Sequence, residues 1–360
     1  MEYIRSVFDK KRIILLISAL GTLLLGLILV AIGIGVTGKL SDQQFARRWC
    51  KDDSYAQATA FFSEVSGFSP EKVRELNAKI EKKLTDESIS NPNENGRLWI
   101  NAYSANGKVT VDSAISTASV KAIGVGGDFF LFHPVNFIEG TFFDPNEVNK
   151  DLCVLDENTA WVLFGSNNIV GKEVEIGGVR HIVTGVVRQE EGRLNRLAGN
   201  NEPTIYLSYE SLSKNGLITY INSYEALMPN PLTGYAKEAI KELAPVEENY
   251  IEVLENSHRF KWTKLLLNVK NFGTRGMNEK GIVYPYWENI ARGYEDYLTP
   301  VAVFGCLFFG YTMVIVFLTL IRMWRKRTIH RSDIKDFVER KIEELREKKK
   351  NKGGEMDEYI

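Results

Sequence analysis

The sequence predicts an α+β domain flanked by two transmembrane α-helices, and three observations support this fold class. Two stretches without a charged residue, 13–36 and 298–321, are each long enough to cross a bilayer core, for which about 20 apolar residues suffice. The segment between them switches between helical periodicity and the period of two that is typical of strands. Strands interleaved with a few helices are typical of α+β domains.

The two apolar stretches divide the chain. We expect a cytoplasmic or interfacial segment over 1–11, a transmembrane helix over 12–36, a domain over 37–297, a second transmembrane helix over 298–321 and a basic tail over 322–360. A cleaved signal peptide is the alternative for the first stretch, but its apolar run exceeds the usual 7 to 15 residues. The net charge of -1 and the 44% of hydrophobic residues argue against a disordered chain and against nucleic acid as a partner.

Basic residues next to these stretches predict the orientation in a plasma or inner membrane. Lys10, Lys11 and Arg12 precede the first stretch. Several basic residues follow the second, before any acidic one: Arg322, Arg325, Lys326, Arg327 and Arg331. Lys and Arg near the ends of spans favour the cytoplasmic side. We therefore expect both termini in the cytoplasm and the domain outside it, with membrane lipid as one partner.

Local signals place helices and strands along the domain. Ser69 and Pro70 begin a predicted helix. Its apolar stripe recurs at spacings of three and four residues: Val73, Leu76, Ile80 and Leu84. After a loop over 90–96, a hairpin is predicted from 98–100 and 109–111 around a turn at 105–108, followed by a strand over 119–125.

The rest of the domain is also predicted to contain both strands and helices. Strands are predicted over 151–155, 173–176, 180–187, 204–207, 217–220 and 250–254, and helices over 157–164 and 235–243. Gly177 and Gly178 predict a two-residue hairpin turn. Gly165 predicts the end of a helix, and Gly140 predicts a turn that needs a positive φ. Three aromatic pairs are interpreted as core packing: Phe61–Phe62, Phe129–Phe130 and Phe142–Phe143.

Motifs of catalysis and metal binding are missing from the sequence. The stretch from Gly165 to Lys172 departs from a phosphate-binding loop in spacing and in Glu173. The histidines lack a second ligand at a short spacing: His133, His181, His258 and His330. The carboxylate pairs Asp52–Asp53 and Glu190–Glu191 are interpreted as solvated. We expect no enzyme and no catalytic, cofactor-binding or metal-binding residue. The sequence does not decide whether Cys50 and Cys153 form a disulfide. Cys306 lies in the second apolar stretch.

Several short motifs, in this order, resemble the periplasmic core domain of MacB-type ABC transporter permeases. They are 120–130 (VKAIGVGGDFF), 137–143 (FIEGTFF), 153–155, 163–165 (LFG), 170–178 (VGKEVEIGG) and 182–187 (IVTGVV). The first apolar stretch, with its glycines at 21, 33 and 35, also resembles the first span of that family. One departure is that these permeases have three spans after the domain, whereas one follows it here.

The resemblance implies a non-enzymatic membrane subunit of an ABC-type export or envelope-remodelling complex. Its partners would be a separate ATPase subunit, a four-span permease, or both, and a homodimer or heterodimer would fit. In the tail, apolar and basic residues over 334–345 predict an amphipathic helix that docks a protein, binds lipid or is merely solvated. A domain that binds or senses an external molecule and signals through this tail is the alternative function.

Overall fold

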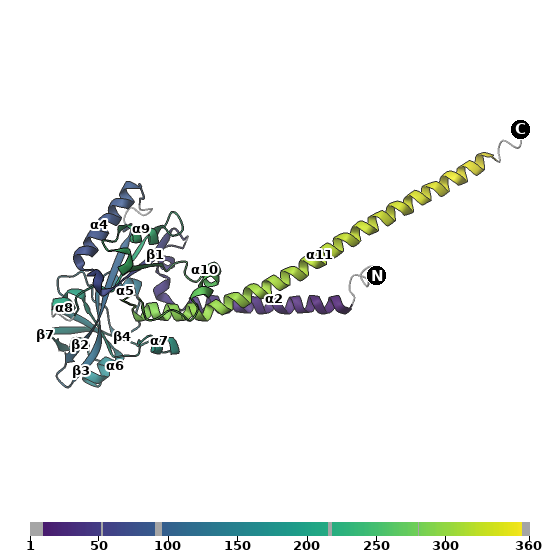
Figure 1. Ribbon diagram of the computed structural model, residues 1–360. Coiled ribbons are helices and arrows are strands. Elements are labelled where there is room, and N and C mark those ends of the chain that lie inside the picture. Colours follow the sequence, from purple (N-terminus) through teal and green to yellow (C-terminus); the bar gives the residue numbers. More distant parts are fainter. Residues whose placement is uncertain (1–9, 52, 91–95, 215–217, 280, 355–360) are drawn as a thin grey trace. The chain divides into compact units, whose positions relative to one another are not determined.

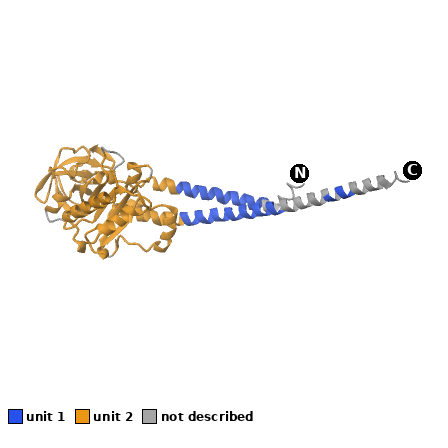
Figure 2. Ribbon diagram, turned by 90° about the horizontal axis from the view of Figure 1, so that it is seen from above, with its two compact units in different colours: residues 1–32, 301–360 blue, residues 33–300 orange. Residues whose placement is uncertain are grey.

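The computed structural model describes residues 10–51, 53–90, 96–214, 218–279 and 281–354, without the side chains of 10–12, 326–338, 340, 341 and 345–354. Asp52, most of the predicted 90–96 loop and Leu217 therefore lie outside the described residues. The chain divides into two compact units, one of residues 1–32 and 301–360 and the other of residues 33–300 (Figure 2).

Two helices form the first unit. They are α2 (Lys10–Thr37) and α11 (Tyr286–Gly354), and both continue into the second unit. Both are long and apolar enough to cross a membrane. Within the unit they touch: Thr22 Oγ1 lies 2.9 Å from Thr312 Oγ1, and Ser18 Oγ lies 2.9 Å from the hydroxyl of Tyr311. The predicted tail helix over 334–345 is part of α11, and its Ile342 is exposed.

A ten-stranded sheet organises the second unit (Figure 1). Its order is β10-β1-β9-β2-β3-β8-β5-β7-β4, with β6 paired to both β2 and β7. The strands are β1 (Tyr55–Phe62), β2 (Ile100–Asp112), β3 (Thr117–Gly127), β4 (Phe137–Gly140), β5 (Leu152–Asp156), β6 (Glu173–Ile176), β7 (Val179–Val187), β8 (Thr204–Ser208), β9 (Ser223–Pro229) and β10 (Ile251–Glu255). A small hairpin is made by β11 (Asn278–Glu279) and β12 (Ile282–Val283).

Short helices connect these strands. The α-helices are α3 (Phe45–Trp49), α4 (Pro70–Asp86), α5 (Phe129–Phe132), α6 (Glu157–Phe164), α7 (Arg193–Leu197), α8 (Tyr209–Lys214), α9 (Tyr235–Leu243) and α10 (Trp262–Leu267). The 3-10 helices are η1 (Ser41–Gln43), η2 (Glu64–Ser66), η3 (Glu248–Tyr250) and η4 (Asn268–Asn271).

Strand pairing closes one half of the sheet into a barrel. Because β6 pairs with β2 and β7, the strands β2, β3, β8, β5, β7 and β6 form a continuous ring. The core of this ring contains Val111, Val120, Val174 and Ile205, all buried. Ring closure pairs the six strands on both sides, and β4, which pairs only with β7, remains as an edge strand in this half.

The other half is an open layer of β10, β1 and β9 beside β2. Helices α4 and α9 cover one of its faces (Figure 1). The four apolar residues predicted as a stripe on α4 are all buried there. Ala58, Ala60 and Phe62 of β1 point to the same core. Since strand side chains alternate, the residues between them, Gln57 and Thr59, belong to the opposite face.

Most predicted elements are confirmed with small shifts at their ends. The predicted helices at 157–164 and 235–243 are α6 and α9. Gly177 and Gly178 have φ of 58° and 80°, as a two-residue hairpin turn with positive φ requires, and Gly140 has φ of 74°. Of the aromatic pairs, five rings are buried, whereas Phe142 is 47% exposed.

Two predicted strand features are wrong. The turn at 105–108 does not exist, because β2 runs unbroken from Ile100 to Asp112 and Gly107 simply pairs with Ala122 of β3. The hairpin turns instead at 113–116, where Ser113 Oγ accepts from the backbone N–H of Ser116 at 3.0 Å. No strand forms over 218–220. Ile221 instead donates its backbone N–H to the carbonyl of Phe68, and the next strand begins at Ser223.

Candidate functional site

The face of the open layer that α4 and α9 leave uncovered carries a row of buried polar side chains. Gln57 and Thr59 come from β1, and Glu225 comes from β9, where it lies opposite Thr59 in the ladder. All three are at most 2% exposed. Burying a carboxylate costs free energy unless it is paired and hydrogen-bonded. Glu225 therefore needs charged and hydrogen-bonding partners within the domain.

Glu225 is paired with a histidine, in a set of residues that we call the His133 cluster: Asp42, Gln57, Thr59, His133 and Glu225. His133 Nε2 contacts Glu225 Oε2. Its other nitrogen, Nδ1, lies 3.3 Å from Asp42 Oδ1, close enough for an ion pair but not aligned as a hydrogen bond. Asp42 is in η1, directly after α2, so this cluster joins the exit of α2 to the sheet.

The charge state of His133 follows from its surroundings. Burial alone would lower its pKa, but the carboxylates of Glu225 and Asp42 outweigh burial and raise it to about 10. The imidazole is therefore positively charged over the physiological range. Its ring also packs against Trp287 of α11, with centroids 4.3 Å apart. The cluster thus joins the segment that follows α2 to the first turn of α11.

A second set of charged residues holds the first turns of α11, and we call it the Arg259 cluster: Arg259, Arg275, Glu288, Arg292 and Glu295. Arg259 donates to both oxygens of Glu288, at 2.6 and 2.7 Å, and through Nε to Glu295 at 2.6 Å. Glu288 and Glu295 both belong to α11. Such two-pronged pairing fixes orientation as well as distance.

Two further arginines complete this cluster. Arg292 donates through Nε to Glu288 at 2.8 Å, and its guanidinium lies 3.5 Å from the ring centroid of Tyr284. Arg275 contacts Glu295 and donates to Asp296 at 2.9 Å. Burial alone would raise the pKa of Glu295, but the charges of Arg259 and Arg275 bring it below its usual value. The carboxylate therefore stays ionised.

The two clusters are joined into one network. Asn256 donates to Gln43 Oε1 at 2.9 Å, and Arg259 donates to the same oxygen at 3.4 Å. Thr59 Oγ1 lies 2.9 Å from both Glu225 Oε1 and Asn256 Oδ1, and its single proton can satisfy only one of them at a time. A chain of polar contacts therefore runs from η1, after α2, across the sheet to α11.

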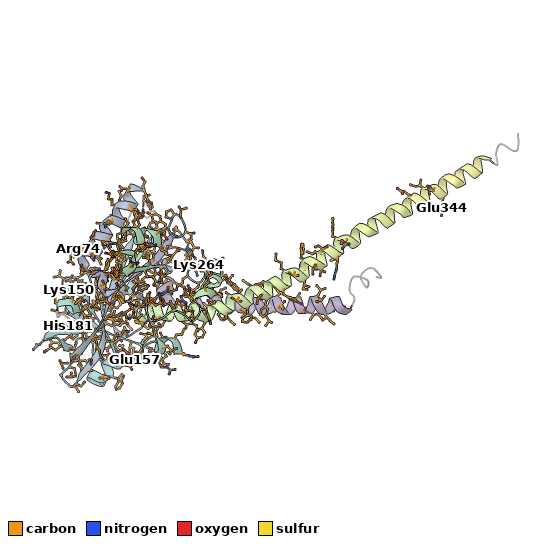
Figure 3. The ribbon with its side chains drawn as sticks, viewed as in Figure 1. Arg74, Lys150, Glu157, His181, Lys264 and Glu344 are labelled. Carbon is orange, nitrogen blue, oxygen red and sulfur yellow. The ribbon has the colours of Figure 1, made fainter. Side chains whose placement is uncertain are left out.

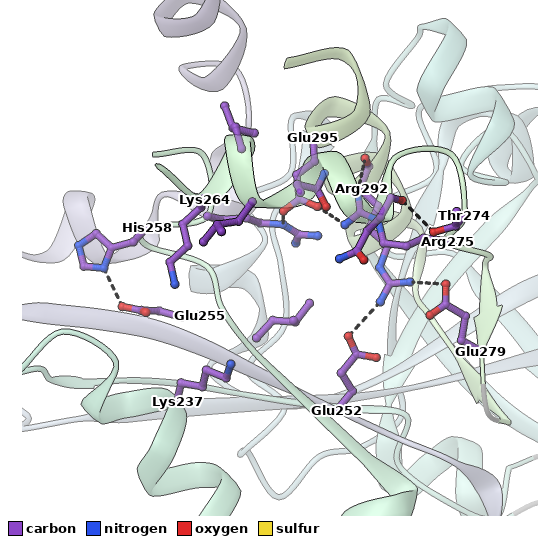
Figure 4. A pocket seen from close by; sticks show the side chains of 16 residues that line it. Lys237, Glu252, Glu255, His258, Lys264, Thr274, Arg275, Glu279, Arg292 and Glu295 are labelled. Carbon is purple, nitrogen blue, oxygen red and sulfur yellow. Dashed lines mark hydrogen bonds and ion pairs between the residues drawn. The ribbon is translucent and has the colours of Figure 1, made fainter. Parts of the chain in front are cut away.

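A cavity of about 490 Å³ opens beside the Arg259 cluster (Figure 4). Lys237 of α9 and Lys264 of α10 line it together with Glu252 and Arg275. Its walls carry charges of both signs. Such a space fits a polar, uncharged or zwitterionic group better than an apolar one, because apolar ligands leave buried charges unsatisfied.

The residues that the sequence singled out lie apart from one another. Among the described residues, no three His, Cys, Asp or Glu side chains gather as a metal site would require. His181 lies 2.6 Å from Ser211 Oγ, and His258 lies 2.7 Å from Glu255. No disulfide joins Cys50 to Cys153, and Cys153 is fully buried. Ser54 donates to Cys50 Sγ at 3.4 Å.

Sequence reasoning missed the network because its members are far apart in the chain. His133 and Glu225 are separated by 92 positions, and Arg259 and Glu288 by 29. One signal was available. Glu225 lies in the strand Ser223–Pro229, and Glu288 and Glu295, seven residues apart, lie on the same face of a helix that leads into an apolar stretch. Carboxylates in such positions require buried partners.

Comparison with known proteins identifies the family of the domain. Residues 14–234, more than half of the chain, match the MacB-like periplasmic core domain. This chain belongs to the MacB-like periplasmic core domain family. The His133 cluster lies within the matched range, whereas the Arg259 cluster, from Arg259 to Glu295, follows residue 234.

Curated MacB relatives are similar over part of their length. The macrolide export ATP-binding/permease protein MacB of Chromobacterium violaceum is 32% identical over 95 residues, which is 26% of this chain and 14% of that protein. The protein of the same name from Vibrio parahaemolyticus is 27% identical over 113 residues, which is 31% of this chain and 17% of that protein. The chain therefore aligns with less than a fifth of each relative.

Two solved structures are similar at low identity. The periplasmic region of MacB from Actinobacillus actinomycetemcomitans has a TM-score of 0.41 and 13% identity, covering 61% of this chain and 94% of that one. The extracellular domain of the ABC-type transporter YknZ from Gram-positive bacteria has a TM-score of 0.36 and 16% identity, covering 55% of this chain and 99% of that one.

Proposed function

We propose that the chain is a non-enzymatic membrane subunit of an ABC-type export or envelope-remodelling complex. In this proposal α2 and α11 cross the membrane, both termini are cytoplasmic, and the MacB-like domain is outside the cytoplasm. The MacB relatives are named as ATP-binding/permease proteins, so a separate ATPase, a separate permease or both are the expected partners of this chain.

The observation that carries this proposal is the network that ties the exits of both helices to one sheet. Asp42 follows α2, Glu288 and Glu295 begin α11, and buried ionic contacts connect all of them to the domain. Charged contacts of this kind have discrete geometries and do not deform gradually. A displacement of α11 would therefore be passed to the domain, which suits a protein that transmits motion across a membrane.

The test is purification of the tagged full chain in mild detergent, with a second sample ending after Arg327. We expect an ATPase or a permease to accompany the full chain and to be lost or reduced with the shortened one. The matched control is Ile115→Glu, on the exposed turn between β2 and β3, which should keep the partner. Recovery of neither partner with the full chain would overturn the proposal.

The cavity beside the Arg259 cluster favours a second candidate function, a domain that binds an external molecule and signals through the tail. A ligand in that cavity would contact Arg275 and Glu295, and so would act directly on the first turns of α11. Recovery of a kinase or another regulator with the full chain, in place of an ATPase, would favour this candidate.

A further inference from the structure

The segment 262–272, made of α10, η4 and Phe272, presents a cluster of apolar side chains to the surface. Leu267 is 65% exposed, Phe272 is 52% exposed and Val269 is 49% exposed. Only Leu265 is buried, and it holds the segment to the domain. Single exposed apolar residues are common in soluble proteins, but a contiguous set marks an interaction surface.

This surface lies level with the start of the second apolar stretch. Asn268 of η4 donates its Nδ2 to Thr299 Oγ1 at 3.3 Å, and Thr299 donates to the carbonyl of Glu295 at 2.7 Å. Thr299 is the second residue of the uncharged stretch that begins at Leu298. Figure 3 shows Lys264 on the side of the domain from which α11 leaves, away from Lys150, His181 and Glu157.

Two lysines lie within the segment, Lys264 and Lys270, and Lys261 directly precedes it. Lys261, Lys264 and Lys270 are exposed, and the segment 262–272 contains no acidic residue. Leucine and phenylalanine mixed with lysine are typical of segments that lie in the plane of a membrane surface, where the apolar side chains enter the acyl boundary and the lysines contact anionic headgroups. A surface that binds another protein carries no such requirement for lysine.

We infer that the segment 262–272 inserts its apolar side chains into the outer leaflet of the membrane that α11 crosses. The inference rests on the proposed function, in which α11 crosses the membrane. Because the segment 262–272 adjoins the start of that span, lipid is the partner expected to cover it. The segment follows residue 234, so it lies outside the range that matches the family.

The test uses the full chain with Cys50→Ser, Cys153→Ala and Cys306→Ala, carrying a bimane probe on one introduced cysteine. Leu267→Cys reports on the segment, Ile115→Cys on an exposed turn elsewhere in the domain, and Leu307→Cys on the apolar part of α11; these positions are 65%, 70% and 60% exposed. Each variant is reconstituted in vesicles of phosphatidylcholine and phosphatidylglycerol with lipids brominated near the top of the acyl chain. Size exclusion and circular dichroism confirm folding.

We expect brominated lipid to quench the probe at 267 several-fold more than the probe at 115. Equal weak quenching at 267 and 115, with strong quenching at 307, would overturn the inference and leave the span intact. No quenching at 307 would instead contradict the proposed span. A probe at 267 protected from both brominated lipid and aqueous iodide would show that protein covers the segment, which also overturns the inference. Phe272→Cys repeats the measurement if Leu267→Cys does not fold.

Discussion

The exits of α2 and α11 are attached to the same domain in different ways. Arg259 holds the first turns of α11 through short ion pairs to Glu288, whose side chain is fully buried, and to Glu295. The chain after α2 is held mainly by neutral hydrogen bonds. Gln57 Nε2 donates to the carbonyl of Asp42 at 2.8 Å, and Gln44 Nε2 contacts the carbonyl of Thr37. Its ionic contact, from Asp42 to His133, is longer at 3.3 Å.

This difference indicates that the two helices have different freedom. A buried ion pair with short, two-pronged geometry costs several kcal/mol to break on one side, because the remaining charge stays buried. A neutral hydrogen bond contributes about 0.5–1.5 kcal/mol and can be exchanged for water. The domain is therefore expected to follow α11 as a rigid extension, whereas the exit of α2 can adjust. The predictions that follow test this asymmetry.

Glu288→Gln should produce the largest loss of stability. The change leaves Arg259 and Arg292 buried with one carboxylate fewer, and removal of one partner of a buried pair costs about 3–5 kcal/mol. The free energy of unfolding, measured by denaturant titration of the full chain in detergent, should fall by that amount. The matched control is Glu248→Gln, whose ion pair with Lys241 is exposed and screened by solvent, so its loss should be far smaller. Equal losses in the two variants would refute the asymmetry.

Glu225→Gln should have a smaller effect at the exit of α2. The amide keeps the shape and still accepts from Thr59 or Gln57, so only the charge-assisted contact with His133 is lost. Hydrogen bonds to charged groups contribute about 1.5–3 kcal/mol, and the same denaturant titration should show a loss in that range. A loss larger than that of Glu288→Gln would reverse the order of the two attachments.

The stability of the domain should fall as the pH rises above neutrality. The pKa of folded His133 is about 10, above its ordinary value of 6.5. Its contribution is therefore complete below about pH 6.5 and is lost as the pH rises through about 10. The melting temperature should decline between pH 7 and 10 more steeply in the unaltered chain than in His133→Gln, at about 2–4 °C for each kcal/mol lost. Parallel declines would exclude His133 as the titrating group.

The smallest effect is expected between the two helices of the first unit. Thr312→Val removes the contact with Thr22 and the hydrogen bond to the carbonyl of Ala19. Hydrogen bonds between transmembrane helices average about 0.6 kcal/mol, so the free energy of unfolding should change by about that much. A double-mutant cycle with Thr22→Val isolates the pairwise part. A coupling of several kcal/mol would place the main attachment in the membrane and not in the domain.

Regular elements with strong local signals were predictable. The helix at Pro70–Asp86 has a proline at its first turn and an apolar stripe, and the hairpin at 173–187 has two glycines at its turn. These features depend on residues next to one another in the chain. The strand Tyr55–Phe62 was missed because it is buried on both faces, so alternation of polar and apolar residues does not reveal it.

The network was not predictable for a different reason. Its pairs depend on the order of the strands, since β9 returns between β1 and β2 and brings Glu225 opposite Thr59. Likewise Arg259 meets Glu288 only because the chain after β10 turns back onto α11. Local periodicity says nothing about such contacts, and histidine and arginine give no signal of burial by themselves. The apolar stretch at 298–321 also hid the fact that α11 begins at Tyr286, inside the domain.

The measurement that tests the account most directly is the distance between the domain and the first turns of α11. Spin labels at Ile115→Cys and Tyr297→Cys, in the chain without its natural cysteines, report this distance by pulsed electron resonance; both positions are exposed. We predict one narrow distribution for the intact network, and a broader one after Glu288→Gln. A broad or multiple distribution with the network intact would contradict the rigid attachment of α11, and with it the proposed transmission of motion to the domain.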